Sequence, residues 1–216
     1  MARAGLTVDR LVAAAADLAD EAGFENVTLS ALARHFGVKD ASLYSHVRNL
    51  QDLRSRMALF AGGEMIDRIA EAVAGRAGKD ALAAFAGAYR EYALQHPGRY
   101  AATQIRIDQA LVTGHPAFRR TAEITYGMLR AYGLDEPDLT DAVRLLRATF
   151  HGYCALEASG GFGAPRDVQK SWDRAVDALH VALEHWPREG DVLSRSPRVP
   201  GLRRTWASSP GAPGPP

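Results

Sequence analysis

The chain has 216 residues, with 26 basic and 25 acidic side chains, so its formal net charge is +1. This balance excludes a broadly basic nucleic-acid coat protein and a basic peptide that lies on membranes. A single cysteine excludes an internal disulfide and a cysteine-based zinc site. Because no apolar run approaches the roughly 18 residues of a membrane span, we expect a soluble cytoplasmic protein without membrane contact.

Charge is distributed unevenly along the chain. Residues 1–27 hold two arginines against five acidic residues, a net charge of −3, whereas residues 28–56 hold five basic residues against two acidic ones, a net charge of +3. The balanced total therefore does not exclude DNA binding by the second segment.

The C-terminal end differs in composition from the rest of the chain. Seven of the 11 prolines fall at Pro187 or later, together with arginine and glycine. Such a segment cannot bury enough apolar surface to offset the entropy lost on ordering. We expect a disordered tail over 189–216, which either only aids solubility or helps to hold DNA non-specifically.

Apolar residues recur at spacings of three and four before this tail, which predicts an all-α fold. Thr7 and Gly23 are suited to begin and end the first helix, and Thr28 to begin the second. Asn49, followed by Asp52, resembles a capping box that opens a long helix. The helices expected in chain order cover about 8–22, 29–36, 39–47, 50–74, 80–95, 99–110, 116–132, 139–158 and 167–186.

Residues 28–47 carry the most specific pattern, because they predict two short helices joined by a tight turn. Gly37 tolerates the positive φ that such a turn needs. Ala33 is small where the helices would cross, and Val38 and Leu43 would pack the second helix onto the first. This is the geometry of a helix-turn-helix, in which the second helix enters the major groove of DNA.

The start of this second helix offers side chains suited to DNA contact. Small residues there permit a close approach, and the Ser42 hydroxyl can reach a base edge or a phosphate. Tyr44 and His46 can bond phosphate oxygens. Plain structural alternatives remain: Tyr44 as a core residue and Lys39 as a solvated turn residue. Asp40 either caps the helix or accepts a hydrogen bond from a cytosine amino group.

This segment resembles the TetR/AcrR family of bacterial transcriptional regulators. The resemblance spans about residues 7–55 and rests above all on the run Ser42-Leu43-Tyr44-x-His46-Val47. It implies that the third helix reads the major groove while Thr28, Tyr44 and His46 contact phosphates. Leu50 stands where the family usually has lysine, so Arg48 or Arg54 is expected to substitute. The residues expected to contact DNA are Thr28, Ser30, Lys39, Asp40, Ala41, Ser42, Tyr44, His46 and Arg48.

The C-terminal part resembles one variety of this family's regulatory domain. The run 88–100 is similar to its characteristic helix junction, and Phe150-His151-Gly152 is similar to its Trp-His-Gly motif, with Phe150 in place of tryptophan. The resemblance implies a homodimer through the helices at about 139–158 and 167–186. It also implies a small-molecule pocket enclosed by the helices expected between about 50 and 158, without naming the ligand.

The candidate ligand contacts each have a structural alternative. The aromatic candidates are equally explained as core residues, and His151 as a core histidine satisfied by a neighbour. Gln104 and Asp108 lie one helical turn apart and either form the polar end of a pocket or face solvent. The candidates are Phe85, Tyr89, Tyr100, Gln104, Asp108, Tyr126, His151 and Tyr153.

Two adjacent glycines, Gly62 and Gly63, interrupt the long helix expected at 50–74. Glycine costs about 1 kcal/mol relative to alanine inside a helix, so the pair calls for a reason. One hypothesis is a hinge that bends when the DNA-binding unit moves. The alternative is that a neighbouring helix packs closely against them.

We predict three parts: a helix-turn-helix DNA-binding unit at 1–50, a helical ligand-binding and dimerisation domain at 51–188, and the tail at 189–216. The expected function is a ligand-responsive regulator, a repressor that binds a palindromic double-stranded DNA operator as a homodimer and is released by a small molecule. No catalytic residue, metal site or cofactor is expected. The alternatives are a helical ligand-binding or enzymatic module without DNA binding, and a DNA-architectural protein without a ligand.

Overall fold

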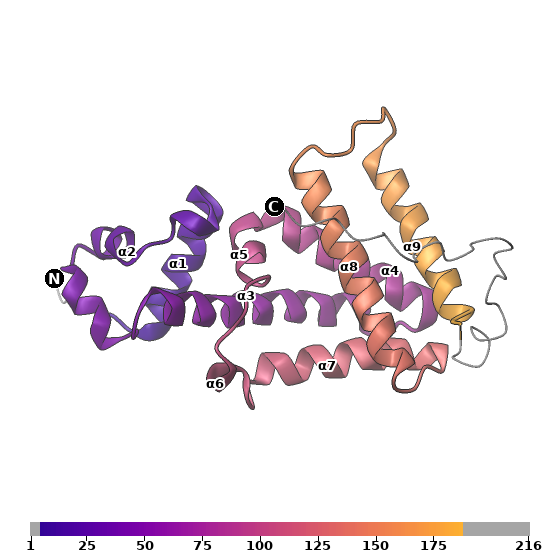
Figure 1. Cartoon of the computed structure of the whole chain (residues 1–216), viewed down its shortest axis with the longest axis horizontal. Coiled ribbons are helices and arrows are strands. Elements are labelled where there is room, and N and C mark those ends of the chain that lie inside the picture. The colour runs from indigo at the N-terminus through magenta and orange to yellow at the C-terminus, as the bar shows by residue number, and fades with distance from the viewer. Residues whose placement is uncertain (1–4, 188–216) are drawn as a thin grey trace, which may run out of the picture. The chain divides into compact units, whose positions relative to one another are not determined.

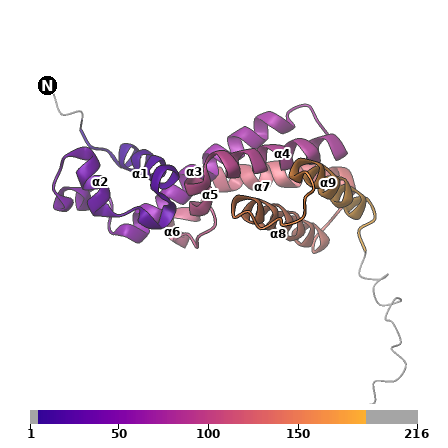
Figure 2. The same ribbon diagram turned by 90° about the horizontal axis from the view of Figure 1, so that it is seen from above.

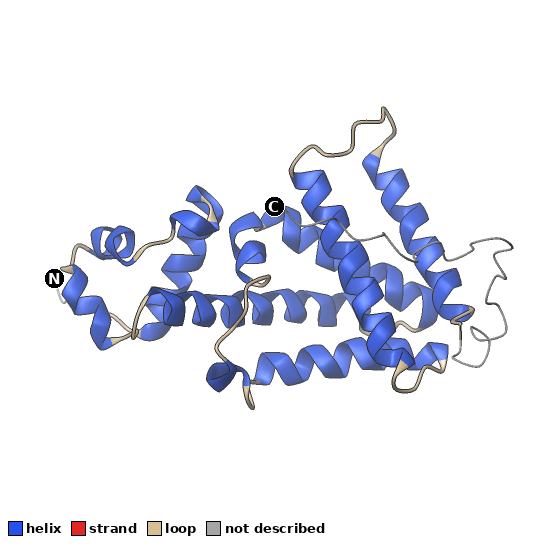
Figure 3. Ribbon diagram, in the orientation of Figure 1, coloured by secondary structure: helices blue, strands red, loops and turns tan. Residues whose placement is uncertain are grey.

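The computed structural model describes residues 5–187, and every regular element within that range is helical (Figure 3). The predicted all-α fold is therefore confirmed, whereas the tail predicted at 189–216 lies outside the described residues. The elements are α1 (Val8–Ala22), η1 (Phe24–Asn26), α2 (Leu29–Phe36), η2 (Asp40–Ser45), α3 (Leu50–Val73), α4 (Gly78–Gln95), α5 (Pro97–Ala102), α6 (Gln109–Val112), α7 (Pro116–Leu129), η3 (Arg130–Tyr132), α8 (Asp138–Ala158) and α9 (Val168–Glu184), where η marks a 3₁₀ helix.

The three predicted helix starts carry the expected side-chain caps. Thr7 Oγ accepts a hydrogen bond from the backbone of Arg10 at 3.3 Å. Thr28 Oγ accepts one from Ala31 at 3.1 Å, and Asn49 Oδ1 accepts one from Asp52 at 2.8 Å. Each oxygen satisfies a backbone N–H that the helix itself leaves unpaired, so the sequence locates these helix starts correctly.

The helix predicted at 99–110 is wrong, because α5 already ends at Ala102. Beyond it the Thr103 hydroxyl donates to the Tyr100 carbonyl at 2.7 Å. Ile105 and Ile107 then pack against the core of the N-terminal helices. The packing of these two partly buried side chains against that core explains the break, since apolar spacing alone does not show which partner a side chain meets.

α3 connects the two halves of the fold. Figure 1 shows α1 and α2 at one end of α3 and α7 alongside its other end, and Figure 2 shows α8 and α9 at the end away from α1 and α2. The first turns of α3 bury Leu53 and Met57 in the same core as Leu11, Leu32 and Leu43. The described residues up to Glu184 belong to one compact unit, so the proposed division at 50/51 falls at the start of a shared helix.

Arg90 ties the C-terminal helices together. Its guanidinium on α4 donates to both carboxylate oxygens of Glu157 on α8, at 2.7 and 2.6 Å, and to the side-chain oxygen of Gln169 on α9 at 2.5 Å. It also lies over the ring of Trp172, 5.4 Å from the centroid. A planar guanidinium suits such a fork of acceptors, and it fixes α8 and α9 on α4.

Candidate DNA interface and ligand cavity

A left-handed glycine makes the turn after α2. Gly37 has φ +64°, and the backbone N–H of Val38 donates to the Ala33 carbonyl at 2.9 Å. The chain then enters η2, a 3₁₀ helix rather than the α-helix that the sequence predicts. Ser45 Oγ donates to the Ser42 carbonyl at 2.8 Å. Serine and aspartate often form such local bonds in place of a regular helix, which accounts for the 3₁₀ geometry.

Asp40 is held by a neighbouring serine. The Ser30 hydroxyl on α2 donates to the Asp40 carboxylate at the start of η2. Lys39 stands at the N-cap position of η2, but its side chain makes no capping hydrogen bond. Asp40 therefore braces the turn between α2 and η2, and this geometry favours neither of the two roles weighed for it from the sequence.

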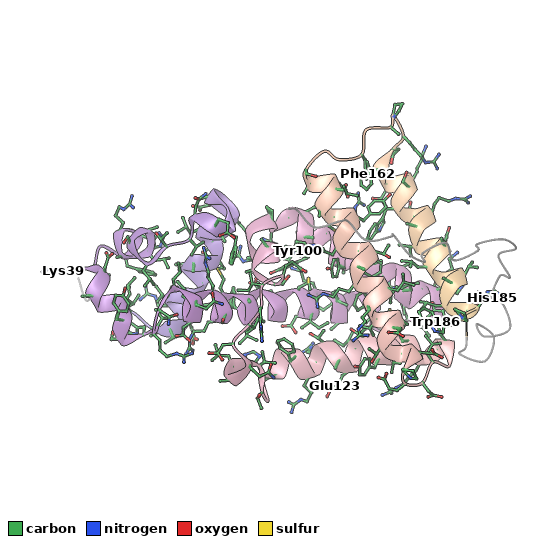
Figure 4. The ribbon with its side chains drawn as sticks, in the orientation of Figure 1. Lys39, Tyr100, Glu123, Phe162, His185 and Trp186 are labelled. Atoms are coloured by element: carbon green, nitrogen blue, oxygen red, sulfur yellow. The ribbon has the colours of Figure 1, made fainter. Side chains whose placement is uncertain are left out.

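Most of the residues expected to contact DNA are exposed on this end of the molecule. Tyr44 is 58% exposed, so it is not a core residue. Lys39 stands at the outer tip of the N-terminal helices (Figure 4). His46 is half-buried. The exposed members of the set are Thr28, Ser30, Lys39, Asp40, Ala41, Ser42, Tyr44 and Arg48.

The two arginines considered as substitutes for the missing lysine at Leu50 differ in freedom. Arg54 lies over the ring of Phe24, 4.9 Å from its centroid, with its side chain only 21% exposed. The Arg48 side chain is 64% exposed and lies 3.0 Å from Asp52. Of the two, Arg48 is the better placed to meet a phosphate.

Asp52 is a buried carboxylate at the junction of the two halves. It accepts hydrogen bonds from the backbone and the guanidinium of Arg48, both at 3.0 Å, and from Arg56 at 3.3 Å. Burial alone raises the pKa of Asp52, but the bonds from Arg48 and Arg56 outweigh it and lower the pKa below its ordinary value. Arg48 also donates to Asp108, at 2.9 Å, so the start of α3 is linked to the segment before α6.

A second polar cluster joins α1 to α5. The Asp20 carboxylate accepts from the backbone of Arg99 at 2.8 Å and lies 3.0 Å from Nδ1 of His96. The Arg99 guanidinium also reaches Asp17, at 2.5 Å. Beside this cluster a Cβ on Gly98 would lie 1.9 Å from the Ala19 carbonyl oxygen. Only glycine permits this approach, so α5 is fitted to the end of α1.

A cavity of about 500 Å³ lies beyond this junction. It is lined by the middle of α3, by α4, by the segment from α5 to α6, and by α7 and α8. Its wall is mostly apolar with a few polar groups, which is typical of small-molecule sites. The wall residues are Ala58, Leu59, Gly62, Met65, Ile66, Ile69, Phe85, Tyr89, Thr103, Gln104, Ile105, Arg106, Ile107, Gln109, Val112, Ala117, Phe118, Thr121, Thr125, Val143, Leu146, Arg147 and Phe150.

Three of the predicted ligand contacts, Phe85, Tyr89 and Gln104, lie in this wall. Asp108 instead caps α6, accepting from Ala110 at 3.0 Å, and pairs with Arg48. Gln104 and Asp108 therefore do not share a helical face, because the expected common helix ends at Ala102.

Two other predicted ligand contacts also lie outside the wall. Tyr126 on α7 is 37% exposed. Tyr153 packs on Phe162 and Trp172, with ring centroids 4.8 and 5.0 Å apart.

Tyr100 and His151 lie behind the cavity and connect to it through Tyr89. The hydroxyl oxygens of Tyr89 and Tyr100 are 2.9 Å apart, and the Tyr100 hydroxyl lies 2.8 Å from Nδ1 of His151. Tyr100 stands in the interior of the molecule (Figure 4). Burial raises the pKa of both phenols above the ordinary value, so both stay protonated. The contacts from Tyr89 through Tyr100 to His151 join α4, α5 and α8.

Sequence reasoning missed Arg147, Thr121 and Thr125 in the cavity wall. A signal was present on α8, where Val143, Leu146, Arg147 and Phe150 share one face of the helix at spacings of three and four. The prediction named none of these four residues as a ligand contact and chose His151 and Tyr153 on α8 instead. An arginine within an apolar helical face is the pattern that would have revealed the cationic side of the cavity.

Among the described residues, no helix has the length and apolar character needed to cross a bilayer. No group of three or more histidine, cysteine, aspartate or glutamate side chains is arranged to hold a metal ion in the part of the chain that the structure describes.

A helix-turn-helix mounted on an all-α body defines a helical DNA-binding regulator. Comparison with protein families agrees: residues 11–57 match the family of bacterial regulatory proteins known as the tetR family. Residues 82–179 match the tetracyclin repressor-like C-terminal domain. Together these two matches cover both halves of the fold.

Two relatives show the same family over most of the chain. An uncharacterized HTH-type transcriptional regulator of Mycobacterium tuberculosis, Rv0681, is 35% identical over 158 residues, which are 73% of this chain and 72% of the relative. The HTH-type transcriptional regulator YobS of Bacillus subtilis is 31% identical over 169 residues, 78% of this chain and 88% of the relative. The chain belongs to the tetR family and is a transcriptional regulator.

Solved structures share the fold at lower identity. BioQ of Mycobacterium smegmatis has a TM-score of 0.62 at 22% identity, covering 84% of this chain and 99% of its own. ActR of Streptomyces coelicolor in complex with actinorhodin has a TM-score of 0.66 at 18% identity, covering 83% of this chain and 97% of its own. This likeness shows the fold alone.

Proposed function

We propose that this chain is a cytoplasmic, ligand-responsive repressor that binds a palindromic operator as a homodimer and is released when a small molecule fills the cavity. One observation carries the proposal: the cavity wall and the core of the DNA-binding helices share side chains. Ala58 belongs to both, and Ile105 and Ile107 line the cavity while they pack against that core. A ligand that moves these residues changes the packing under the helix-turn-helix.

The direction of this coupling follows from linkage. A ligand shifts an equilibrium only by its difference in affinity for the two states. Release therefore requires that the ligand bind the form with low DNA affinity better. The cavity also argues against a purely architectural DNA-binding protein, which needs no such space. Among proteins of the same fold, BioQ is known with its natural double-stranded DNA operator and ActR with actinorhodin.

The exposed apolar faces of α8 and α9 support the homodimer. Leu145 and Leu156 on α8 are 38% and 47% exposed, and Val181 on α9 is 54% exposed. Leu145 and Leu156 are eleven residues apart, which places them on one face of a helix. Exposed apolar side chains gathered on adjoining helices are typical of an interface, and a two-fold dimer presents two helix-turn-helices to a two-fold operator.

A mobility-shift titration with the DNA upstream of the chain's own gene tests this proposal. We expect a discrete complex that resists excess random DNA and holds two chains per inverted repeat. The paired variant Leu145→Glu and Leu156→Glu should sediment as a folded monomer and bind this DNA at least tenfold more weakly. Failure of the folded wild-type chain to form a complex in about 100 mM salt, or undiminished binding by a monomer, contradicts the proposal.

A further inference from the structure

The cavity wall carries charge of a single sign. Among the described residues that line it, the charged side chains are those of Arg106 and Arg147, and none is acidic. The other polar side chains of the wall are neutral, and they include the hydroxyls of Tyr89, Thr121 and Thr125. A cationic ligand would therefore find no carboxylate there and would meet two like charges.

Arg147 lies on the face of α8 that lines the cavity, between Leu146 and Phe150. Its charge acts on the buried phenols of Tyr89, in the wall, and of Tyr100, behind it. Although burial is the main influence and raises the pKa values of Tyr89 and Tyr100, the positive charge of Arg147 acts on both in the opposite direction. The guanidinium is thus close enough to act electrostatically on groups at the cavity.

Arg147 also differs from two other arginines of the C-terminal helices, Arg144 and Arg90. Arg144, one turn earlier on α8, lies 3.2 Å from Asp141, and Arg90 is paired with Glu157. Within residues 5–187 no carboxylate lies within ion-pair distance of Arg147. An arginine without a counter-charge at an apolar wall is suited to an incoming anion, because its fork of N–H donors matches a carboxylate.

We propose that the cavity binds an amphipathic anion, with an apolar body among the side chains of α3, α4 and α7 and a carboxylate paired with Arg147. This inference rests on the proposed function, since it names the class of effector that the cavity takes. Arg147 is exposed, so solvent screens the pairing. We therefore expect a preference of about tenfold for an anion over a neutral analogue, which corresponds to about 1.4 kcal/mol.

Calorimetric titration of the full chain with three probes of one shape tests the charge. The probes are decanoate, 1-decanol and decylammonium, each below its aggregation concentration. We expect decanoate to bind about tenfold more tightly than decanol, and decylammonium to bind most weakly. Equal affinities for decanoate and decanol, or tighter binding of decylammonium, overturn the proposal.

Variants assign the effect to its residue. Arg147→Gln should abolish the preference for decanoate over decanol, and Arg147→Lys should restore part of it. Arg144→Gln is the matched control, one turn away on the same helix, and should leave the preference unchanged. Gly62→Leu should weaken all three probes, because a side chain added at Gly62 projects from the cavity wall into open space. A preference that survives in Arg147→Gln refutes the assignment.

Failure of this inference can be distinguished from failure of the proposed function. If none of the three probes binds while the chain still forms a discrete complex with its upstream DNA, the ligand class is wrong and the DNA-binding role stands. If the probes bind as expected but no DNA complex forms, the cavity assignment stands and the repressor proposal fails.

Discussion

Tyr44 projects into solvent from η2, and the half-buried His46 follows where this helix ends. We expect Tyr44→Ala and His46→Ala each to weaken binding to specific and random DNA by a similar factor, about five- to tenfold, which is one hydrogen bond's worth. Phosphate contacts hold the protein on the duplex without reading sequence. Fluorescence anisotropy with both DNAs measures this. If neither change weakens binding, the DNA interface lies elsewhere.

Lys39 is one of three lysines in a chain that otherwise uses arginine. If Lys39 neutralises a phosphate, Lys39→Ala should reduce the slope of log K against log salt by about one. Lys79 on α4 provides a control, because its Nζ lies 2.8 Å from the carboxylate of Asp177 on α9. Lys79→Ala should leave the slope unchanged, and an unchanged slope for Lys39→Ala would place this residue away from DNA.

Single residues also show what sequence reasoning can reach. Thr7, Thr28 and Asn49 were located as caps because a cap depends on neighbours within four residues. Asp108 was assigned to a pocket that it does not line, because its partner Arg48 is 60 residues away. Contacts between distant segments leave no periodic signal in the sequence, so the pairing of Asp20 with Arg99 was also missed.

The fit of α5 against α1 depends on one glycine. We expect Gly98→Ala to destabilise the fold by about 1–3 kcal/mol or more, because the added carbon overlaps the backbone of Ala19 and forces the helices apart. Chemical denaturation measures this. Gly87→Ala on α4 is the control, since a side chain there meets nothing within 4 Å, and it should stabilise the chain by about 0.5–1 kcal/mol. Equal effects of the two changes would contradict the fit.

The two glycines of α3 have more room than close packing requires. The helix is continuous from Leu50 to Val73, a Cβ at Gly62 meets nothing within 4 Å, and one at Gly63 meets Ala117 at an ordinary 3.8 Å. The close-packing alternative is thus disfavoured and the hinge hypothesis stays a prediction. Gly62→Ala with Gly63→Ala should raise the melting temperature and change DNA affinity at least fivefold. A stabilised chain with unchanged affinity would rule out the hinge.

Helices with a continuous apolar face were predicted well, and the irregular segment between them was not. α1, α2, α3 and α8 lie within two residues of their expected bounds, because each has both a cap or boundary residue and a buried face. Residues 103–108 were predicted as helix and are not. Their apolar side chains are partly buried against the N-terminal core, and local propensity cannot decide such a tertiary contact.

For the molecule as a whole, acid should loosen the junction between the two halves. Burial raises the pKa of Asp20, but hydrogen bonds from Arg99 and His96 outweigh it and lower the pKa below its ordinary value. Asp52 is lowered likewise by Arg48 and Arg56. A carboxylate with a lowered folded-state pKa stabilises above its unfolded value near 3.9, and this stability is lost as the pH falls through the folded value.

We therefore expect the free energy of unfolding to fall as the pH drops below about 4, and Asp20→Asn to reduce that dependence. At pH 7 the same variant should lose about 1–3 kcal/mol, because Arg99 keeps a weakened partner. Asp135→Asn, at an exposed carboxylate, is the control. Urea unfolding at a series of pH values measures both, and an Asp20→Asn profile parallel to the wild type would contradict this assignment.

Ion pairs limit how much of the positive charge of the basic segment is available to DNA. The basic segment 28–56 carries +3 in sequence, but Arg48, Arg54 and Arg56 are engaged with Asp52, Asp108 or Glu25. Few cations are therefore left to hold phosphates. We expect selectivity to depend on the fit to the groove, with weak binding to random DNA at physiological salt.

Genome-wide mapping of the sites bound by the chain in its own cells tests the central claim most directly. The account predicts a small number of discrete sites that share an inverted repeat, one of them upstream of the chain's own gene. It also predicts that these sites vanish when Tyr44→Ala and His46→Ala are combined. Uniform binding along the genome, or sites that persist in this folded double variant, would contradict the account.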